Sequence, residues 1–333
     1  MIEILTTGAV NSVQDMGRRG YLDVGVGWSG AMDRPALAVA NSLVGNGEDA
    51  AGIEIALFPF RIRFERRTAF AVSGADCPVT LDGRALPSWW AETAWEGQVL
   101  TVGLPRKGAR AYLAVGGGIE TPQVLGSRAT DLKSGFGGLE GRGLRRGDRL
   151  PVGPARGTDM PDGGFGIDPT VLGRGSRTEA NVIPLRVLPA AEYDDFADEA
   201  RQQFLGGDWR VSAEANRMGY RLDGPTLALK HKLELFSHGI MPGTVQVPPS
   251  GQPIIQLAEA NTCGGYPKIA TVIEPHLWRL AQAPVGATLR FELIERCDAV
   301  AEIARERAAL SDIAALARLA RRDRSRREII DVE

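Results

Sequence analysis

The stretch RIRFERRTAFAV, residues 61–72, contains two short β-like runs, RIRF and AFAV, separated by four residues. Similar runs recur along the chain at residues 99–102, 111–115 and 288–293. The chain also has 41 glycines and 20 prolines, which place turn signals between such runs. Many short strands separated by turns are typical of β-barrels or sandwiches, and not of an alternating parallel α/β fold. The sequence therefore predicts a mainly β fold with a few helices.

Helical patterns are confined to a few segments. Asp33 can cap a helix that has Pro35 in its first turn and stops at the glycines that follow. We expect further helices over residues 190–205 and 274–283. The tail from residue 298 changes character, because apolar side chains recur there at helical spacing. These apolar residues are Ile303, Leu310, Ile313, Leu316 and Leu319. The tail predicts either a solvated terminal helix or a helix that binds a partner.

A chain of 333 residues is too long for one ordinary core, which suggests two domains or one large β-rich unit. A glycine turn that leads into a strand occurs three times, which fits two similar halves but is also a common hairpin entry. Residues 151–177 are rich in Gly, Pro and Asp and lack periodicity, so we expect a linker there. The predicted domains are a first β-rich unit at 1–150, a linker at 151–180, a second unit at 181–297 and a helical tail at 298–333.

Composition narrows the class of protein. The formal net charge of −2 gives no electrostatic reason to expect binding to nucleic acid or to an anionic membrane. No apolar run approaches the ~20 residues that a membrane-spanning helix needs. The first residues, MIEIL, lack the basic region of a signal peptide and are typical of a strand. Three widely spaced cysteines favour reduced thiols over a disulfide framework. We therefore expect a cytoplasmic protein.

Common catalytic and cofactor motifs are incomplete. Residues 25–30 match the dinucleotide pattern GxGxxG, but no parallel βαβ pattern follows, and Asp33 would repel a pyrophosphate. The sequence has no GxxxxGK phosphate loop, no metal-binding histidine spacing, no GxSxG elbow and no biotin-accepting lysine between methionines. The glycine-rich run at 134–143 can present backbone N–H groups to a phosphate or serve only as a structural loop. We expect no metal and no cofactor bound by this chain alone.

Several blocks of the sequence resemble the allophanate hydrolase subunit 2 family, which is a family of biotin-dependent carboxyltransferase-like proteins. They follow the family's order over about residues 1–295. The clearest blocks are VQDMGRRGY (13–21), SGAMD (29–33), LGSRATD (125–131), NRMGYRL (216–222), GTVQVP (243–248) and GGYPKIATVI (264–273). The resemblance implies two cyclophilin-like β-barrel units, in agreement with the strand-rich pattern.

The same resemblance implies partners and an activity. The free bacterial version pairs with subunit 1 of the family (the B subunit) and joins a lactam-utilisation polypeptide (the A subunit) to open the 5-oxoproline lactam with ATP. We therefore expect the C subunit of an ATP-dependent 5-oxoprolinase, a hetero-oligomeric hydrolase, with ATP used by the complex and no turnover by this chain alone.

Two alternatives remain open. In the fused version, urea carboxylase, this core moves carboxylate from biotin to urea, so biotin is implied only if carboxyl transfer is the activity. Some relatives have a non-catalytic role and antagonise a protein inhibitor of a sporulation kinase by binding it.

Departures from the family's pattern lie at polar positions. Ser237-His238-Gly239 replaces Ser-Glu-Gly, and Ser250 replaces an aspartate in a Pro-Pro-Asp-Gly-Gln-Pro turn. Residues 258–266 read AEANTCGGY where the family usually has ADRQTTGGY, so Glu259, Ala260, Asn261 and Cys263 differ. These departures leave the substrate open between 5-oxoproline, urea and another small amide.

Chemistry on an amide builds negative charge on the amide oxygen, so the site needs fixed hydrogen-bond donors and a group that handles one proton. Arg217 can give a forked contact to an anion, and Gln246 and Gln252 can present rigid amides at turns. Glu259 is the candidate general base, because it is the one carboxylate in the densest family block. Arg217 and Glu259 are thus the candidate catalytic residues.

The candidate substrate-binding residues surround that carboxylate in sequence or lie at the two turns. They are Gln246, Gln252, Asn261, Thr262, Gly264, Gly265, Tyr266 and Lys268. Asn261 and Thr262 could orient the substrate, and Lys268 could pair with its carboxylate. A purely structural explanation also fits: the Gly264–Pro267 segment is a good strand-turn device, and Glu259 could pair with Lys268 or Arg217.

Overall fold

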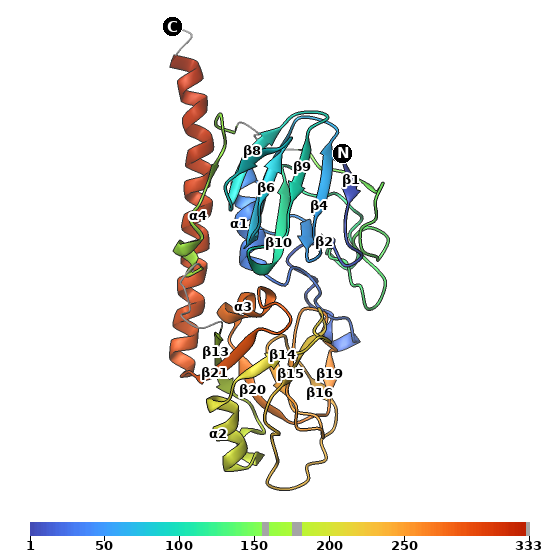
Figure 1. The fold of residues 1–333 in the computed structure, drawn as a ribbon, viewed down its shortest axis with the longest axis vertical. Coiled ribbons are helices and arrows are strands. Elements are labelled where there is room, and N and C mark those ends of the chain that lie inside the picture. The colour runs from blue at the N-terminus through green and yellow to red at the C-terminus, as the bar shows by residue number, and fades with distance from the viewer. Residues whose placement is uncertain (155–159, 175–181, 331–333) are drawn as a thin grey trace. The chain divides into compact units, whose positions relative to one another are not determined.

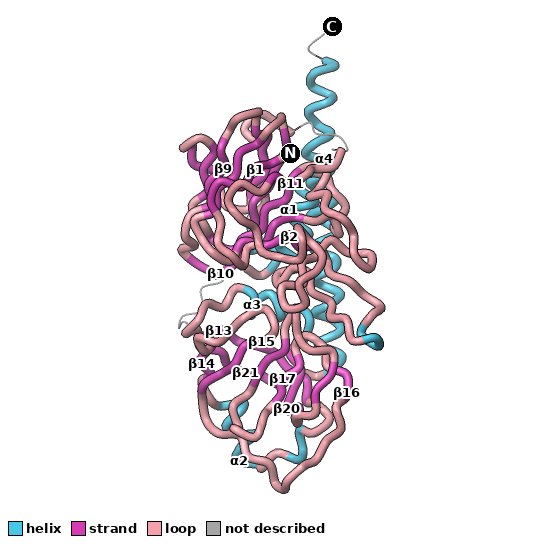
Figure 2. Tube along the Cα trace, turned by 90° about the vertical axis from the view of Figure 1, so that its right-hand side faces the viewer, coloured by secondary structure: helices cyan, strands magenta, loops and turns pink. Residues whose placement is uncertain are grey.

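The computed structural model describes residues 1–154, 160–174 and 182–330, with residues 322–330 described as backbone only. Parts of the predicted linker, residues 155–159 and 175–180, therefore lie outside the described residues. Strands and loops dominate and helices are few, so the fold is mainly β as predicted (Figure 2). None of the described helices is both long enough and apolar enough to cross a bilayer.

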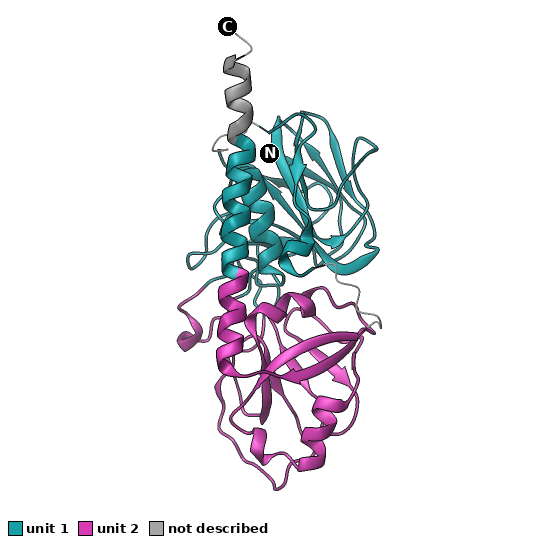
Figure 3. Cartoon of the chain, turned by 90° about the vertical axis from the view of Figure 1, so that its left-hand side faces the viewer, with its two compact units in different colours: residues 1–18, 29–175, 307–333 teal, residues 19–28, 176–306 magenta. Residues whose placement is uncertain are grey.

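The chain divides into two compact units, and each gathers segments that are distant in sequence (Figure 3). Unit 1 contains residues 1–18, 29–175 and 307–333, and unit 2 contains residues 19–28 and 176–306. The predicted domains were continuous stretches, whereas residues 19–28 group with unit 2. Helix α4 (Arg296–Ile330) contributes residues to both units.

Unit 1 is built from two six-stranded sheets. The first has the order β11 (Arg149–Leu150), β1 (Ile2–Thr6), β4 (Phe60–Phe64), β9 (Val99–Val102), β6 (Val79–Leu81) and β7 (Arg84–Leu86). The second has the order β12 (Phe165–Gly166), β8 (Trp90–Ala94), β5 (Thr68–Asp76), β10 (Lys107–Val115), β3 (Gly52–Ile55) and β2 (Ser12–Gln14). Strands β4 and β5 contain the RIRF and AFAV runs that predicted a β fold.

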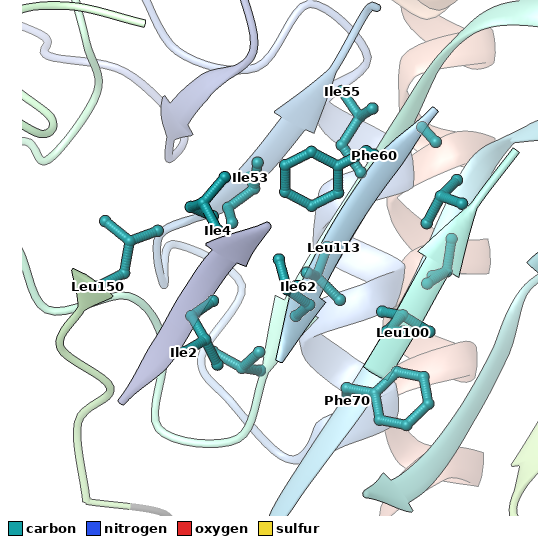
Figure 4. Close-up of a cluster of buried hydrophobic side chains, with 14 of the residues drawn as sticks. Ile2, Ile4, Ile53, Ile55, Phe60, Ile62, Phe70, Leu100, Leu113 and Leu150 are labelled. Carbon is teal, nitrogen blue, oxygen red and sulfur yellow. The ribbon is translucent and has the colours of Figure 1, made fainter. Parts of the chain in front are cut away.

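The core of unit 1 follows from the alternation of side chains along its strands. In β4 the buried residues are Phe60, Ile62 and Phe64, while Arg61 and Arg63 are exposed, as expected for a strand with one face on a core. The buried side chains of both sheets point toward one another in one cluster (Figure 4). Burial of this apolar surface is the main contribution that holds the two sheets together.

Helix α1 (Arg34–Val44) packs on strands β5 and β10 of the second sheet. Its predicted cap is confirmed, because the Ala36 N–H donates to Asp33 Oδ1 at 3.0 Å. The side chains of Ile313 and Ala317 in α4 join the apolar cluster around α1. The predicted apolar stripe of the tail is only partly buried, since Leu316 and Leu319 are 64% and 59% exposed.

Unit 2 is a closed seven-stranded barrel (Figure 1). Its order is β13 (Val182–Pro189), β20 (Lys268–Val272), β17 (Thr244–Gln246), β18 (Ile254–Gln256), β15 (Gly219–Asp223), β14 (Trp209–Val211) and β21 (Thr288–Leu293). The parallel pairing of β13 with β21 closes the ring. A separate two-stranded sheet joins β16 (His238–Gly239) to β19 (Cys263–Gly264).

The helices of unit 2 are short. Helix α2 (Asp198–Gly206) brings Phe204 onto Phe291 of the barrel, with ring centroids 4.3 Å apart. The prediction of one helix over residues 190–205 was wrong in its first half, where only a 3₁₀ turn (Tyr193–Asp195) forms. Phe196 is extended and bridges to Leu229, which interrupts the helical path. The third predicted helix is confirmed as a 3₁₀ turn (Glu274–His276) followed by α3 (Leu277–Ala281).

Candidate functional site

Arg217 and Glu259, the two candidate catalytic residues, form a buried ion pair in unit 2. Antiparallel pairing of β15 with β18 places Gly219 opposite Gln256, and the alignment continues beyond the strands, where the Glu259 N–H donates to the Arg217 carbonyl at 2.9 Å. The Arg217 Nε then donates to Glu259 Oε1 at 2.6 Å. Only 7% of Arg217 and 4% of Glu259 is exposed. Strand register therefore brings together two side chains that are distant in sequence.

This pairing limits how far the side chains of Arg217 and Glu259 are available to a ligand in this structure. A buried charge is costly unless it is paired and hydrogen-bonded, and each partner supplies the opposite charge to the other. The Nε of the Arg217 guanidinium donates its hydrogen bond to Glu259, and one oxygen of that carboxylate accepts it. The arrangement is that of a structural anchor for the segment that starts at Glu259.

Lys268 has a different partner from the one that the sequence suggested. Its Nζ lies 3.3 Å from Glu192 Oε2, and its backbone N–H donates to the same oxygen at 3.0 Å. Of the two structural partners considered for Glu259, the structure therefore selects Arg217. Lys268 is also the cross-strand neighbour of Gln246 through the pairing of β17 with β20.

Gln246 lies in β17 and is 3% exposed. Its Oε1 accepts a hydrogen bond from Gln256 Nε2 at 3.0 Å. Its own Nε2 is buried and has no hydrogen-bond partner among the described residues. A buried amide donor without a partner costs about 1–3 kcal/mol, so this atom is one that a bound ligand would satisfy.

Gln252 is not joined to this group. The Gly224 N–H donates to Gln252 Oε1 at 3.0 Å, and Gln252 Nε2 donates to the Gly224 carbonyl at 3.1 Å. Both ends of the amide are thus satisfied by one backbone position, and the side chain holds two turns together.

The segment from Asn261 to Tyr266 is exposed or half-buried throughout. Asn261 is exposed, and Tyr266 is 47% exposed. The Thr262 carbonyl accepts from the Ile240 N–H at 3.0 Å, next to the pairing of β16 with β19. Gly264 lies against Gln246, because a Cβ atom at this glycine would be 2.9 Å from Gln246 Nε2. Gly265 approaches the Leu235 carbonyl, which a Cβ atom would meet at 3.0 Å.

His238 belongs to the same neighbourhood, although the sequence marked it only as a departure from the family's pattern. It is the cross-strand partner of Gly264. Its Nδ1 lies 2.8 Å from the Phe236 carbonyl, while its Nε2 is buried without a hydrogen-bond partner among the described residues. The only signal for it in the sequence was that a histidine stands where the family usually has a glutamate.

A second histidine of unit 2, His276, has a strongly shifted pKa. Burial, followed by the positive charges of Arg279 and Arg186, lowers the pKa of His276 from 6.5 to about 3. Glu302 Oε2 lies 3.4 Å from Nε2 and would favour a charged ring, but that carboxylate already binds Arg186, so the lowering causes prevail. The Arg186 N–H donates to His276 Nδ1 at 2.9 Å, as a neutral ring requires.

Unit 1 holds a second buried charge network, around the N-terminus of α1. Arg174 donates to both oxygens of Asp33 at 2.6 and 2.7 Å, and Asp33 is fully buried. The Tyr112 hydroxyl donates to Glu54 and accepts from the Asp33 N–H. Burial, then the charges of Glu54 and Asp33, raises the pKa of Tyr112 well above 10. In the described part of the chain, no three His, Cys, Asp or Glu side chains are grouped as metal ligands would be.

Comparison with known proteins places the chain in one family. The model of the carboxyltransferase domain, subdomains A and B, matches residues 24–293. The C subunit of the 5-oxoprolinase of Escherichia coli is 44% identical over 291 residues, which are 87% of this chain and 90% of that protein. The corresponding C subunit of the 5-oxoprolinase of Haemophilus influenzae is 39% identical over 300 residues, covering 88% of this chain and 91% of that protein.

A solved structure has the same fold. The urea carboxylase of Kluyveromyces lactis superimposes with a TM-score of 0.85 at 28% identity. The match covers 94% of this chain but only 29% of that enzyme. This chain therefore belongs to the carboxyltransferase domain family, subdomains A and B, and its relatives include both 5-oxoprolinase subunits and urea carboxylase.

Proposed function

We propose that this chain is the C subunit of an ATP-dependent 5-oxoprolinase, and that its complex adds water across the lactam bond of 5-oxoproline to give glutamate. One observation carries the proposal: the 44% identity to the C subunit of a 5-oxoprolinase extends over 90% of that protein. The match thus extends over most of both sequences.

The contribution of this chain is proposed to be recognition and orientation of the amide. In ring opening, negative charge develops on the lactam oxygen, and a preorganised donor in a water-poor site stabilises it. Gln246 Nε2 is suited to this role, because it is a buried donor without a hydrogen-bond partner among the described residues. Gly264 lies against that donor, where a larger side chain would collide with it.

We propose that the Arg217–Glu259 pair positions the site. For Glu259 to act as a general base, its carboxylate would have to take up a proton and so lose the negative charge that faces a guanidinium 2.6 Å away in a buried setting. A positioning role needs no such change, because the pair already holds the start of the segment that leads to Gly264. Asn261, Thr262, Gly265, Tyr266 and Lys268 remain proposed as residues around the substrate, and Gln252 as a turn clamp at a distance.

The remaining chemistry is proposed to come from partner chains. ATP would be bound and used outside this chain, by a complex with the A and B subunits of the enzyme. The setting is proposed to be the cytoplasm, where ATP is available. The isolated chain is accordingly proposed to have no turnover of its own.

A second function, biotin-dependent carboxyl transfer to urea, is favoured by the likeness to Kluyveromyces lactis urea carboxylase at a TM-score of 0.85. The two functions separate in one assay on the assembled complex. With 5-oxoproline and ATP, the first predicts glutamate release that needs neither biotin nor bicarbonate. With urea, ATP, labelled bicarbonate and a biotinylated carrier, the second predicts label in an acid-labile carboxylated product. Glutamate release without carboxylation supports the proposal, and the reverse result overturns it.

A further inference from the structure

Two buried nitrogen atoms lie near one glycine in unit 2 and have no hydrogen-bond partner among the described residues. They are Gln246 Nε2 and His238 Nε2, and both are closed to solvent. Native proteins satisfy most buried polar atoms, so each exception calls for an explanation such as an unfilled ligand position. Both exceptions belong to residues that have Gly264 as a neighbour.

The hydrogen bond of His238 fixes what its other ring nitrogen can do. Nδ1 lies 2.8 Å from the Phe236 carbonyl oxygen. A carbonyl oxygen only accepts, so Nδ1 must carry the proton of that bond. In the neutral ring, Nε2 is then an acceptor. Gln246 Nε2, the nitrogen of an amide, is a donor. The two nitrogens thus form one donor and one acceptor.

Both side chains are neighbours of Gly264. His238 and Gly264 are directly opposite each other in the antiparallel pair of β16 and β19, and side chains at opposite positions lie on the same face, with Cβ atoms about 4.5–5.5 Å apart. A Cβ atom at Gly264 would point toward the Gln246 amide, at 2.9 Å from Nε2. Gly264 is therefore a neighbour of both side chains, of His238 through strand pairing and of Gln246 through the close approach of its amide.

We propose that Gln246 and His238 together recognise an amide whose C=O and N–H lie on the same edge. The carbonyl would accept from Gln246 Nε2, and the N–H would donate to His238 Nε2. A ring amide presents this edge because the ring forces its amide bond to be cis, and urea presents it as well. An ordinary peptide does not, because its trans bond points the two groups in opposite directions. This inference rests on the proposed function, and it adds which edge of the amide substrate the two residues recognise.

The site is closed in this structure, and Ile240 closes it. A Cβ atom at Gly264 would be 2.6 Å from Ile240 Cδ1, so this methyl group occupies the space beside Gly264 and the Gln246 amide. The methyl group is the far end of a flexible side chain, and a rotamer change moves it. Ligand entry thus requires displacement of Ile240 Cδ1 and a small opening of the two-residue strands β16 and β19.

The experiment is a ligand titration of the assembled complex without ATP, followed by saturation-transfer NMR. The probes are 5-oxoproline, urea, 2-pyrrolidinone and N-methyl-2-pyrrolidinone. The last two have the same ring and carbonyl, but the methyl group removes the N–H. We expect 2-pyrrolidinone to bind about tenfold or more tightly than its N-methyl derivative, because the latter leaves a buried acceptor unpaired. Equal affinities would overturn the proposal.

Variants with matched shape test the two residues separately. In His238→Asn, the short amide can still donate to the Phe236 carbonyl but has no acceptor where Nε2 lies. In His238→Gln, the longer side chain can place its amide oxygen there. We expect about tenfold weaker 2-pyrrolidinone binding for the first variant and recovery for the second. Gln246→Glu keeps an acceptor for Gln256 but removes the donor, and it should also weaken binding about tenfold.

The outcomes separate this inference from the proposed function. The complex could bind urea but not 5-oxoproline, and lose that binding in His238→Asn and Gln246→Glu. This result would support recognition of the amide edge and contradict the proposed substrate. If 5-oxoproline binds and neither variant changes its affinity, 5-oxoproline remains the proposed substrate, but the proposal that Gln246 and His238 recognise one edge of the amide is wrong. No binding of any of the four probes would overturn the inference as well.

Discussion

Removal of one charge from the Arg217–Glu259 pair is expected to destabilise the barrel far more than removal of one charge from an exposed pair in the same stretch of the chain. The variant Glu259→Gln preserves volume and can still accept from Arg217 Nε, but it removes the negative charge that faces a guanidinium in a residue that is 7% exposed. Loss of one partner from a buried pair typically costs about 3–5 kcal/mol. Coulomb's law gives a similar figure, about 4 kcal/mol at 4 Å with an effective dielectric constant of ~20.

The matched control is the pair formed by Arg221, on strand β15, with Glu214, which precedes that strand. Arg221 Nε is 2.9 Å from Glu214 Oε2, but the two side chains are 57% and 74% exposed. Exposed pairs contribute little, because water screens the charges and both side chains lose entropy. We therefore expect Glu214→Gln to leave stability almost unchanged, although the distance between its charges is similar to that in the buried pair.

The assay is native-state hydrogen exchange of the amides in β15 and β18, which reports the local opening free energy even if the two units unfold separately. A double variant, Arg217→Met with Glu259→Leu, removes both charges of the pair together and should recover most of the loss of Glu259→Gln. If Glu259→Gln changed exchange no more than Glu214→Gln, the account of the pair as an anchor would be refuted.

The same variants separate positioning from catalysis in the assembled complex. A positioning role predicts that the double variant regains much of the turnover that Glu259→Gln loses, because the strand register is restored. A general base at Glu259 predicts instead that both variants stay about 10²–10⁴-fold below the parent. That second pattern would show the positioning role to be wrong.

Three further predictions concern other parts of the molecule. The pKa of His276 is about 3 in the folded chain and 6.5 in the unfolded chain, so the stability that its neutral ring contributes is complete above pH 6.5 and is lost as the pH falls toward 3. The free energy of unfolding should therefore be about 2 kcal/mol lower at pH 5 than at pH 7. The variant His276→Asn keeps an acceptor for the Arg186 N–H and should reduce this pH dependence in urea titrations. Asp33→Asn should lower the free energy of unfolding of unit 1 by about 3–5 kcal/mol, since the buried Arg174 no longer faces the charge of Asp33; an unchanged midpoint would contradict this. The purified chain without partner chains should release no glutamate from 5-oxoproline in the presence of ATP, and sustained release would show that the site is complete within one chain.

Local features of the sequence were sufficient for much of the fold. Asp33 and Pro35 act within one helical turn, so the start of α1 could be predicted from neighbouring residues alone. The alternation in RIRF likewise identifies a strand with one buried face. Phe196 was misassigned for the opposite reason, since its extended conformation depends on a bridge to Leu229 that no local pattern reports.

The site depends on pairings that the sequence does not contain. It allowed both Arg217 and Lys268 as partners of Glu259, and only the register of β15 with β18 decides for Arg217. His238 became relevant through its pairing with Gly264 in a sheet of two-residue strands. Such short strands have no periodicity of their own, so the pairing of His238 with Gly264 could not be derived before the fold was known.

Glutamate release by a complex reconstituted from this chain and the A and B subunits of the enzyme tests the central claim most directly. The complex is supplied with 5-oxoproline and ATP, and each chain is omitted in turn. The account predicts glutamate and ADP in equal amounts from the complete complex, and no glutamate when this chain is left out. Equal release with and without this chain would contradict its role in the enzyme.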